Sequence, residues 1–468
     1  MDQEKAIVVS SSSEESKSKG KPLTRKQQLI TAGAIFWGNI AFGCAFNTYG
    51  PTVTSLQHKY ETDDDTISRV FTILTGSYMV GALSGGVIFN YVNRQLAALL
   101  LLSTMGAMMF LTPHCPSMGL FFATAAIMGL CCGSYDTAQF VWMMEMMQKD
   151  CPPYVQSQHF FYALGTSLAG LIMAPFLDEE EDDETNSTIT TTTTTMSPDD
   201  EPDYDKLFIP YTIVGLMIAT GVVYQIILIV FVRYYPPPPE ENESDNSQKS
   251  ISTLEDGSTD AALEAPKTSH PFGVWTWPKL RMIVLCCCFY GAYQGMEMCT
   301  FQFFPKFGQN SDLHLSESKS SYVLTGMTVA FAVGRAIAVV AVFKVPLQII
   351  LCVNIFFVVI ANILLVSWAN SSLTVLWASS ILFGFGFSSI YSSFSAYVER
   401  YITFTNFTTA LMIVCGSGVA AIYPLVVGNS IEETPVVLSY TSFFSIFFII
   451  LSFSTLSYLT HKNKTRYQ

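Results

Sequence analysis

Three charged residues stand inside long apolar stretches of the chain. Asp136 lies in GLCCGSYDTAQF, Glu297 in YQGMEMCTFQF and Arg335 in FAVGRAIAVV. A charge at the centre of a bilayer costs at least ~2.5 kcal/mol on insertion scales, so such residues face the protein interior, pair with one another or bind a ligand. No nucleophile or metal-ligand pattern accompanies them. They therefore predict binding or gating of a polar solute or a cation rather than an enzymatic reaction.

Asp136 shares a helical face with two glycines and a phenylalanine, Gly129, Gly133 and Phe140. The glycines allow close approach of another helix or of a solute. The carboxylate has two interpretations. It can bind a sugar hydroxyl, a proton or Na⁺, or it can belong to a structural pair with an Arg or a water cluster. In a span of residues 118–141 it lies roughly 9 Å beyond the centre at helical rise, toward the cytoplasmic end. Gln139 is one turn away.

Glu297 shares a face with an amide, Gln294, and a ring, Phe301. A carboxylate and an amide offer directional hydrogen bonds to sugar hydroxyls, and a ring offers an apolar surface for the C–H face. The alternative to solute binding is that these polar groups form hydrogen bonds between helices.

Arg335 keeps its charge and therefore needs a carboxylate or carbonyl partner, as a gate, a counter-ion or a solute ligand. Three further polar residues are weaker candidates for contact with a solute or cation. Asn47 precedes a break expected at YGPT, Tyr391 lies in the tenth span, and His159 lies near the start of the fifth.

The composition is that of a membrane protein. Half of the 468 residues are hydrophobic and 13% are charged, against roughly 25% charged residues in soluble domains. Twelve segments have the ~20 mostly apolar residues that a spanning helix needs. They cover residues 29–57, 68–90, 96–114, 118–141, 155–177, 208–232, 282–304, 321–343, 346–367, 373–397, 406–428 and 436–459. The expected fold is an all-α membrane protein, which excludes a soluble enzyme.

Loop composition sets the organisation of the chain. Most of the 24 Lys and Arg residues fall on the side of the N-terminus, so both termini are predicted to be cytoplasmic. An acidic, Thr-rich loop at residues 178–207 accounts for much of the net charge of −13, so that charge indicates no particular partner. Asn186 in this loop begins a glycosylation sequon. The expected parts are a disordered tail (1–28), an N-terminal half (29–232) with the extracellular loop 178–207, a cytoplasmic linker (233–281), a C-terminal half (282–459) and a tail (460–468).

The two halves look related. At an offset of 255 residues, Gly129 matches Gly384 and Asp136 matches Tyr391. This pattern predicts a parallel repeat with a site between two six-helix halves, and Tyr391 across it from Asp136. At the cytoplasmic ends, Glu145 and Arg400 either pair across the halves as an inner gate or are simply solvated.

The chain resembles the major facilitator superfamily. That superfamily has a signature G-x-x-x-D-R-x-G-R-K between spans two and three, and residues 86–95, GVIFNYVNRQ, fit it loosely. Asn90 stands at the acidic position and Arg94 at a basic one. This resemblance implies that both take part in gating.

A closer resemblance is to the branch that contains the sodium-dependent glucose transporter and the major-facilitator-domain-containing four proteins. YGPT at Tyr49, GSYDTA at Gly133, HFFYALG at His159 and FAVGRA at Phe331 carry it. GSYDTAQF is also similar to the GLETAANP stretch of fucose–proton symporters, whose acid couples transport to protons. The acid that those symporters carry in span one has no counterpart here, and Asn47 is the nearest polar residue.

The resemblance implies secondary active transport of a hexose such as glucose, by alternating access and coupled to Na⁺ or H⁺. A uniporter, or a carrier of another small polar solute, is an alternative, and a non-transporting scaffold or receptor is one from another class. No cofactor beyond the coupling cation is expected. The expected partners are a sugar and the lipid bilayer, without nucleic acid, for a plasma-membrane monomer. The candidate solute ligands are Asn47, Asp136, Gln139, Gln294, Glu297 and Tyr391, and the coupling or gating residues are Asp136, Glu297, Arg335, Asn90 and Arg94.

Overall fold

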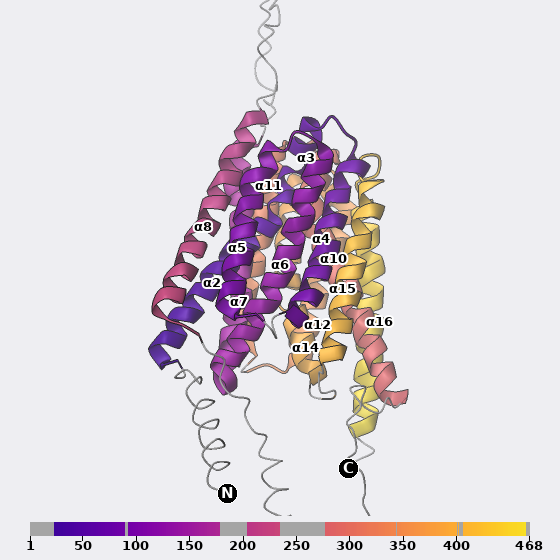
Figure 1. The fold of residues 1–468 in the computed structure, drawn as a ribbon. Coiled ribbons are helices and arrows are strands. Elements are labelled where there is room, and N and C mark those ends of the chain that lie inside the picture. The colour runs from indigo at the N-terminus through magenta and orange to yellow at the C-terminus, as the bar shows by residue number, and fades with distance from the viewer. Residues whose placement is uncertain are drawn as a thin grey trace, which may run out of the picture.

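The computed structural model describes residues 23–88, 92–177, 204–234, 277–342, 344–399, 401 and 406–464. Asn90, Asn186 and Arg400 lie outside these residues, as do most of the two long loops. The described part is built from helices that run roughly parallel (Figure 1).

The helices form two halves. The N-terminal half contains α2 (Arg25–Asn47), α3 (Tyr49–Lys59), α4 (Asp64–Ile88), α5 (Arg94–Leu111), α6 (Met118–Met147), α7 (Cys151–Met173) and α8 (Phe208–Phe231). The C-terminal half contains α10 (Trp277–Asn310), α11 (Glu317–Ala341), α12 (Leu347–Leu364), α13 (Leu373–Phe387), α14 (Ile390–Glu399), α15 (Asn406–Gly428) and α16 (Val437–Lys464). Short helical turns flank them: η1 (Thr112–His114), η2 (Gln148–Asp150), η3 (Ala174–Phe176), η4 (Tyr204–Leu207) and the π-helical η5 (Leu365–Ala369). The start of α2 and the end of α16 lie at one end of the bundle, and α3 lies at the other (Figure 1).

Each predicted span corresponds to one helix or to a broken pair. Among the described residues, ten helical segments are long and apolar enough to cross a membrane, and Val414–Gly428 of α15 is a shorter apolar helix. The helix α4 takes the place of the second predicted span. The chain is thus an all-α, multi-pass membrane protein.

Two predicted span ends are wrong. The fourth span continues to Met147 instead of ending at residue 141. The seventh continues to Asn310 instead of residue 304, and it passes through Pro305. A proline inside a membrane helix is tolerated because neighbouring groups satisfy the freed backbone. As a result, the polar residues after Pro305 lie inside the bundle rather than in a loop.

The first and tenth spans are broken. The helix α2 ends at Asn47 and α3 begins at Tyr49, which confirms the break expected at YGPT. Pro51 explains it, because proline has no N–H and its ring clashes with the carbonyl four residues earlier, that of Asn47. The break between α13 and α14 at Ser388 and Ser389 places Tyr391 in the first turn of α14.

Close backbone contacts between helices confirm the repeat. A Cβ on Gly129 of α6 would lie 2.2 Å from the Leu74 carbonyl oxygen of α4. At the related position of the other half, a Cβ on Gly384 of α13 would lie 2.1 Å from the Met327 carbonyl oxygen of α11. Only glycine allows helices to pack this closely. Between the halves, α4 packs on α15, α7 packs on α11, and α3 lies against α10.

Candidate functional site

Asp136 lies near the middle of α6. With the helix at Met118–Met147, it is about 5 Å beyond the midpoint at helical rise, closer to the centre than the shorter predicted span indicated. Tyr78 Oη donates a hydrogen bond of 2.6 Å to Asp136 Oδ2, and Gln139 Nε2 donates one of 3.2 Å to Oδ1. The carboxylate is therefore held by two neutral donors of its own half, not by an Arg.

Gln139 supports Asp136 and faces away from open space. It is 2% exposed and exchanges two hydrogen bonds with Asn39, of 2.5 Å and 2.8 Å. Its backbone oxygen accepts a third from Gln158. In this structure Gln139 thus contacts the acid directly, and solute binding by Gln139 stays a prediction.

Glu297 is buried where α10 meets the end of α13. Tyr293 Oη lies 2.8 Å from Glu297 Oε1 and 2.9 Å from the Phe387 carbonyl oxygen, so its single proton is shared between them. Gln294 meets a different helix, because a Cβ on Gly416 of α15 would lie 2.2 Å from its Oε1. The structure therefore does not direct Gln294 and Glu297 to one common partner.

Arg335 bridges the two halves. Its Nη1 donates a hydrogen bond of 2.7 Å to the His159 carbonyl oxygen in the N-terminal half, and its Nε donates one of 3.2 Å to the Ser388 carbonyl oxygen in its own half. The guanidinium carbon lies 4.2 Å from the centroid of the Phe331 ring, which adds a cation–π contact. The predicted carbonyl partner is confirmed.

The acids, the arginine and two tyrosines form one polar centre between the halves, made of Asp136, Glu297, Arg335, Tyr162 and Tyr391. Arg335 lies close enough to both carboxylates to interact electrostatically. Tyr162 interacts with all three charged residues, and Tyr391 with both acids. Tyr391 packs edge-on against Tyr290 and is still 38% exposed. The polar centre therefore has accessible surface beside its acids.

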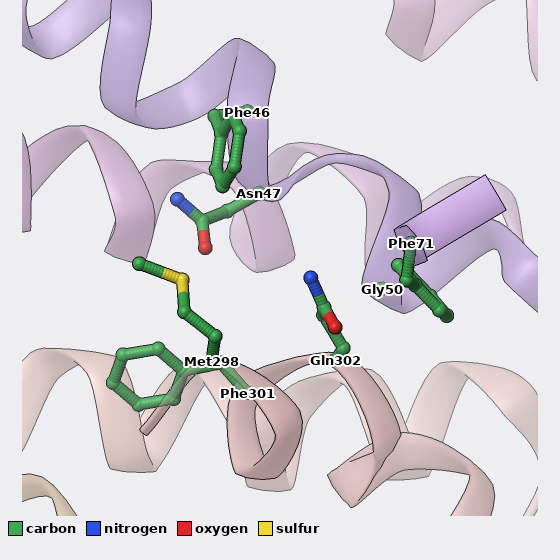
Figure 2. A pocket seen from close by; sticks show the side chains of 7 residues that line it. All are labelled: Phe46, Asn47, Gly50, Phe71, Met298, Phe301 and Gln302. Atoms are coloured by element: carbon green, nitrogen blue, oxygen red, sulfur yellow. The ribbon is translucent and has the colours of Figure 1, made fainter. Parts of the chain in front are cut away.

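A small cavity lies between the halves on the α3 side (Figure 2). It is lined by Phe46, Asn47, Gly50 and Phe71 of the N-terminal half and by Met298, Phe301 and Gln302 of the C-terminal half. Its volume of about 10 Å³ suits roughly one water molecule.

The two amides of this cavity extend into the gap between α2 and α10 (Figure 2). Asn47 Nδ2 lies 2.8 Å from the Gly43 carbonyl oxygen, 3.1 Å from Thr166 Oγ1 and 3.3 Å from Tyr162 Oη, so its two N–H groups are shared among three acceptors. Gln302 Oε1 is buried without a hydrogen-bond partner. Because an unpaired buried oxygen is costly, this acceptor favours a ligand or water that donates to it.

The remaining predicted residues lie elsewhere. Arg94 forms an ion pair of 2.7 Å with Glu145, which also accepts a hydrogen bond from Tyr234 Oη. Arg94 and Glu145 belong to the N-terminal half, and Tyr234 follows its last helix. The structure therefore pairs Glu145 within its own half.

The sequence reasoning missed four residues of the site: Tyr78, Tyr162, Tyr293 and Gln302. The spacing of four residues between Tyr293 and Glu297 was a usable signal, because such pairs face each other on a helix. Tyr78 and Tyr162 come from other helices than the acids, and nothing in their local sequence separates them from packing aromatics.

Comparisons with known proteins agree with this fold. The sequence profile of the Major Facilitator Superfamily matches residues 207–424. The chain is 30% identical over 154 residues to major facilitator superfamily domain-containing protein 4A of Xenopus tropicalis, which covers 33% of this chain and 30% of the frog protein. It is 22% identical over 424 residues to sodium-dependent glucose transporter 1 of Danio rerio, which covers 88% of this chain and 67% of the fish protein. The chain thus spans less than a third of the length of the first of these relatives.

A solved structure extends the comparison to the whole bundle. The chain superposes on a D-xylose-proton symporter with a TM-score of 0.62 at 11% identity, over 92% of this chain and 97% of the symporter. At this identity the likeness concerns the fold alone. Taken with the two related helical halves, it shows that the chain has the fold of this symporter, and residues 207–424 are similar to the Major Facilitator Superfamily profile.

Proposed function

We propose that this protein is a secondary active transporter that moves a hexose by alternating access, coupled to Na⁺ or H⁺. The observation that carries the proposal is the polar centre, in which each half contributes one carboxylate and Arg335 bonds to both halves. A site shared by two halves changes when the halves rock against each other, as alternating access requires.

A sugar fits the chemistry of the residues around the centre. Carboxylates and amides accept hydrogen bonds from hydroxyls, and the unpaired oxygen of Gln302 is one such acceptor. Phe46 and Phe301 offer apolar surface on the two sides of the cavity. The cavity of about 10 Å³ is far below the roughly 300 Å³ of small-molecule pockets. We therefore assign the present conformer to a state in which this part of the path is closed. The name of the fish relative supports a hexose.

Coupling follows from the position of Arg335. The arginine interacts electrostatically with both acids and bonds to both halves. A proton or Na⁺ bound at Asp136 cancels the charge that attracts Arg335. Cation binding thereby changes the free energy that holds the halves together, and a ligand shifts an equilibrium only through such a difference.

The test is uptake of a panel of labelled hexoses into cells that express the chain, with and without Na⁺ and at two pH values. We expect uptake of at least one hexose, a dependence on Na⁺ or pH, and a loss of more than tenfold in Asp136→Asn at matched surface expression. Uptake that depends on neither Na⁺ nor pH contradicts coupling and indicates a uniporter. A scaffold tolerates the substitution and moves no sugar, which contradicts the proposal.

A further inference from the structure

A second group of polar contacts joins the halves at the α3 end, separate from the polar centre. Lys306 Nζ of α10 lies 2.6 Å from Asp64 Oδ1 at the start of α4. Lys306 also donates to Gln57 Oε1 of α3, and Asn310 Nδ2 lies 3.5 Å from Asp64 Oδ2. An ion pair with two amide neighbours thus connects the halves.

This ion pair is enclosed by protein. The side chains of Lys306 and Asp64 are 6% and 5% exposed. Each charge gave up its hydration when the halves met, so each depends on the other, and removing one partner leaves an uncompensated buried charge. The helix N-terminus at Asp64 adds a favourable interaction with the carboxylate.

A second contact fastens the middle of α3 to the start of α11. Both carboxylate oxygens of Glu317 accept from Ser55, one from the backbone N–H at 3.0 Å and one from the hydroxyl. Thr54 Oγ1 donates a hydrogen bond of 2.6 Å to Gln309 Oε1 of α10. Charged acceptors make such bonds stronger than neutral ones.

These contacts cover the cavity between Asn47 and Gln302. Gln302 and Lys306 are one turn apart on α10, on the same face. At Gly50, a Cβ would lie 3.3 Å from the Phe301 carbonyl oxygen, so α3 and α10 approach backbone to backbone there. The contacts of Lys306 and Asp64 therefore lie one helical turn beyond the cavity, toward the α3 end.

We infer that Asp64 and Lys306 are the latch of a gate at the α3 end, and that breaking the latch opens the cavity between Asn47 and Gln302 to that face of the membrane. The inference rests on the proposed alternating access, but it can be tested without a transported solute. In the open state either charge is hydrated, whereas in the closed state a lone charge is buried. Removing one charge therefore shifts the population toward the open state.

The test uses a cysteine reporter in the cavity, Met298→Cys, and a membrane-impermeant maleimide. Right-side-out and inside-out vesicles expose the two membrane faces separately, and the chain without the reporter gives the background from native cysteines. We expect Asp64→Asn and Lys306→Gln each to raise the labelling rate at least tenfold from one face only. The double variant Asp64→Asn/Lys306→Gln buries no lone charge, so we expect its labelling to fall between the wild type and either single variant.

Asp65→Asn is the matched control. Asp65 neighbours Asp64 in the first turn of α4, but it is 33% exposed and pairs with Arg69 of the same helix at 2.5 Å. Its loss changes the same helix terminus without touching the other half, so labelling should stay at the wild-type rate. An unchanged labelling rate in both single variants contradicts the latch, and so does a labelling rate that rises from both faces. A higher labelling rate in Asp65→Asn also contradicts it, as does a double variant that is labelled as fast as the single variants. If the variants are labelled as expected but the chain transports no hexose, the gate is supported and the proposed function is contradicted.

Discussion

The two ends of the bundle use charged residues in different ways. At the α3 end, Asp64 and Lys306 join one half to the other. At the opposite end, the ion pair of Arg94 and Glu145 lies within the N-terminal half. Among the residues that the structure describes, charges thus hold the halves together at one end and hold the helices of one half together at the other.

This difference teaches that closure and rigidity are separate tasks. A moving half must stay intact while its contacts to the other half break and form. Glycine contacts keep each half rigid, because they let its helices pack closely. A Cβ on Gly133 of α6 would lie 2.0 Å from the Tyr78 carbonyl oxygen of α4. The ionic contact of Asp64 with Lys306 serves closure, because water can replace each partner when the halves separate.

The largest expected effect comes from breaking one half internally. In Gly133→Leu the side chain has no room against α4, so we expect destabilisation by more than about 4 kcal/mol, the range of severe overpacking. The measurement is the monodisperse fraction and apparent melting temperature in detergent. Gly76→Leu on α4 is the control, since nothing lies within 4 Å of its Cβ position. Equal losses in both variants contradict the glycine contact.

The next effect separates the two ends. Lys306→Gln removes one partner of an enclosed pair and should destabilise the closed state by about 3–5 kcal/mol. Arg94→Gln affects a pair whose side chains are 12% and 28% exposed, so water replaces part of the lost interaction and the cost should be smaller than in Lys306→Gln. The labelling rate of the Met298→Cys reporter measures the loss of the closed state in Lys306→Gln, and thermal unfolding of the purified chain measures the loss of stability in Arg94→Gln. If Arg94→Gln loses more free energy than Lys306→Gln, the comparison between the two ends is wrong.

A smaller effect sharpens the description of the α3 end. Glu317→Gln still accepts a hydrogen bond from Ser55 but loses its charge, so we expect a cost of about 1 kcal/mol. Labelling of the Met298→Cys reporter should rise about fivefold from one face. A rise equal to that of Lys306→Gln means that the two contacts share the gate equally.

The smallest effect depends on pH. Hydrogen bonds from the Thr66 side chain and backbone lower the pKa of Asp63, which lies before the first residue of α4. A lowered folded-state pKa gives stability that is present above the unfolded value and is lost as the pH falls through the folded value. We expect Asp63→Ala to lower the melting temperature slightly at pH 7 and by less as the pH falls below the ordinary pKa of an aspartate. A difference that does not shrink as the pH falls excludes the ionised carboxylate as its cause.

Much of the fold could be predicted from the sequence, because spans and the glycine repeat depend on local composition. Asp136, Glu297 and Arg335 were recognisable for the same reason, as charges in apolar surroundings. Their tyrosine partners were not, since tyrosine is common in membrane helices. Lys306 follows Pro305 beyond the predicted end of the seventh span at residue 304, so hydropathy places it in a loop. Hydropathy cannot distinguish a charge that faces water from one that faces another helix at the end of a span.

The Asp64 and Lys306 pair also constrains the order of biosynthesis. The two residues are 242 positions apart in the chain. The ribosome therefore completes the whole N-terminal half before Lys306 exists, and Asp64 stays hydrated at the membrane surface until then. Burial of this carboxylate thus reports that the second half has been inserted and has docked. A product truncated before Lys306 leaves this acid at the start of α4 without its ionic partner.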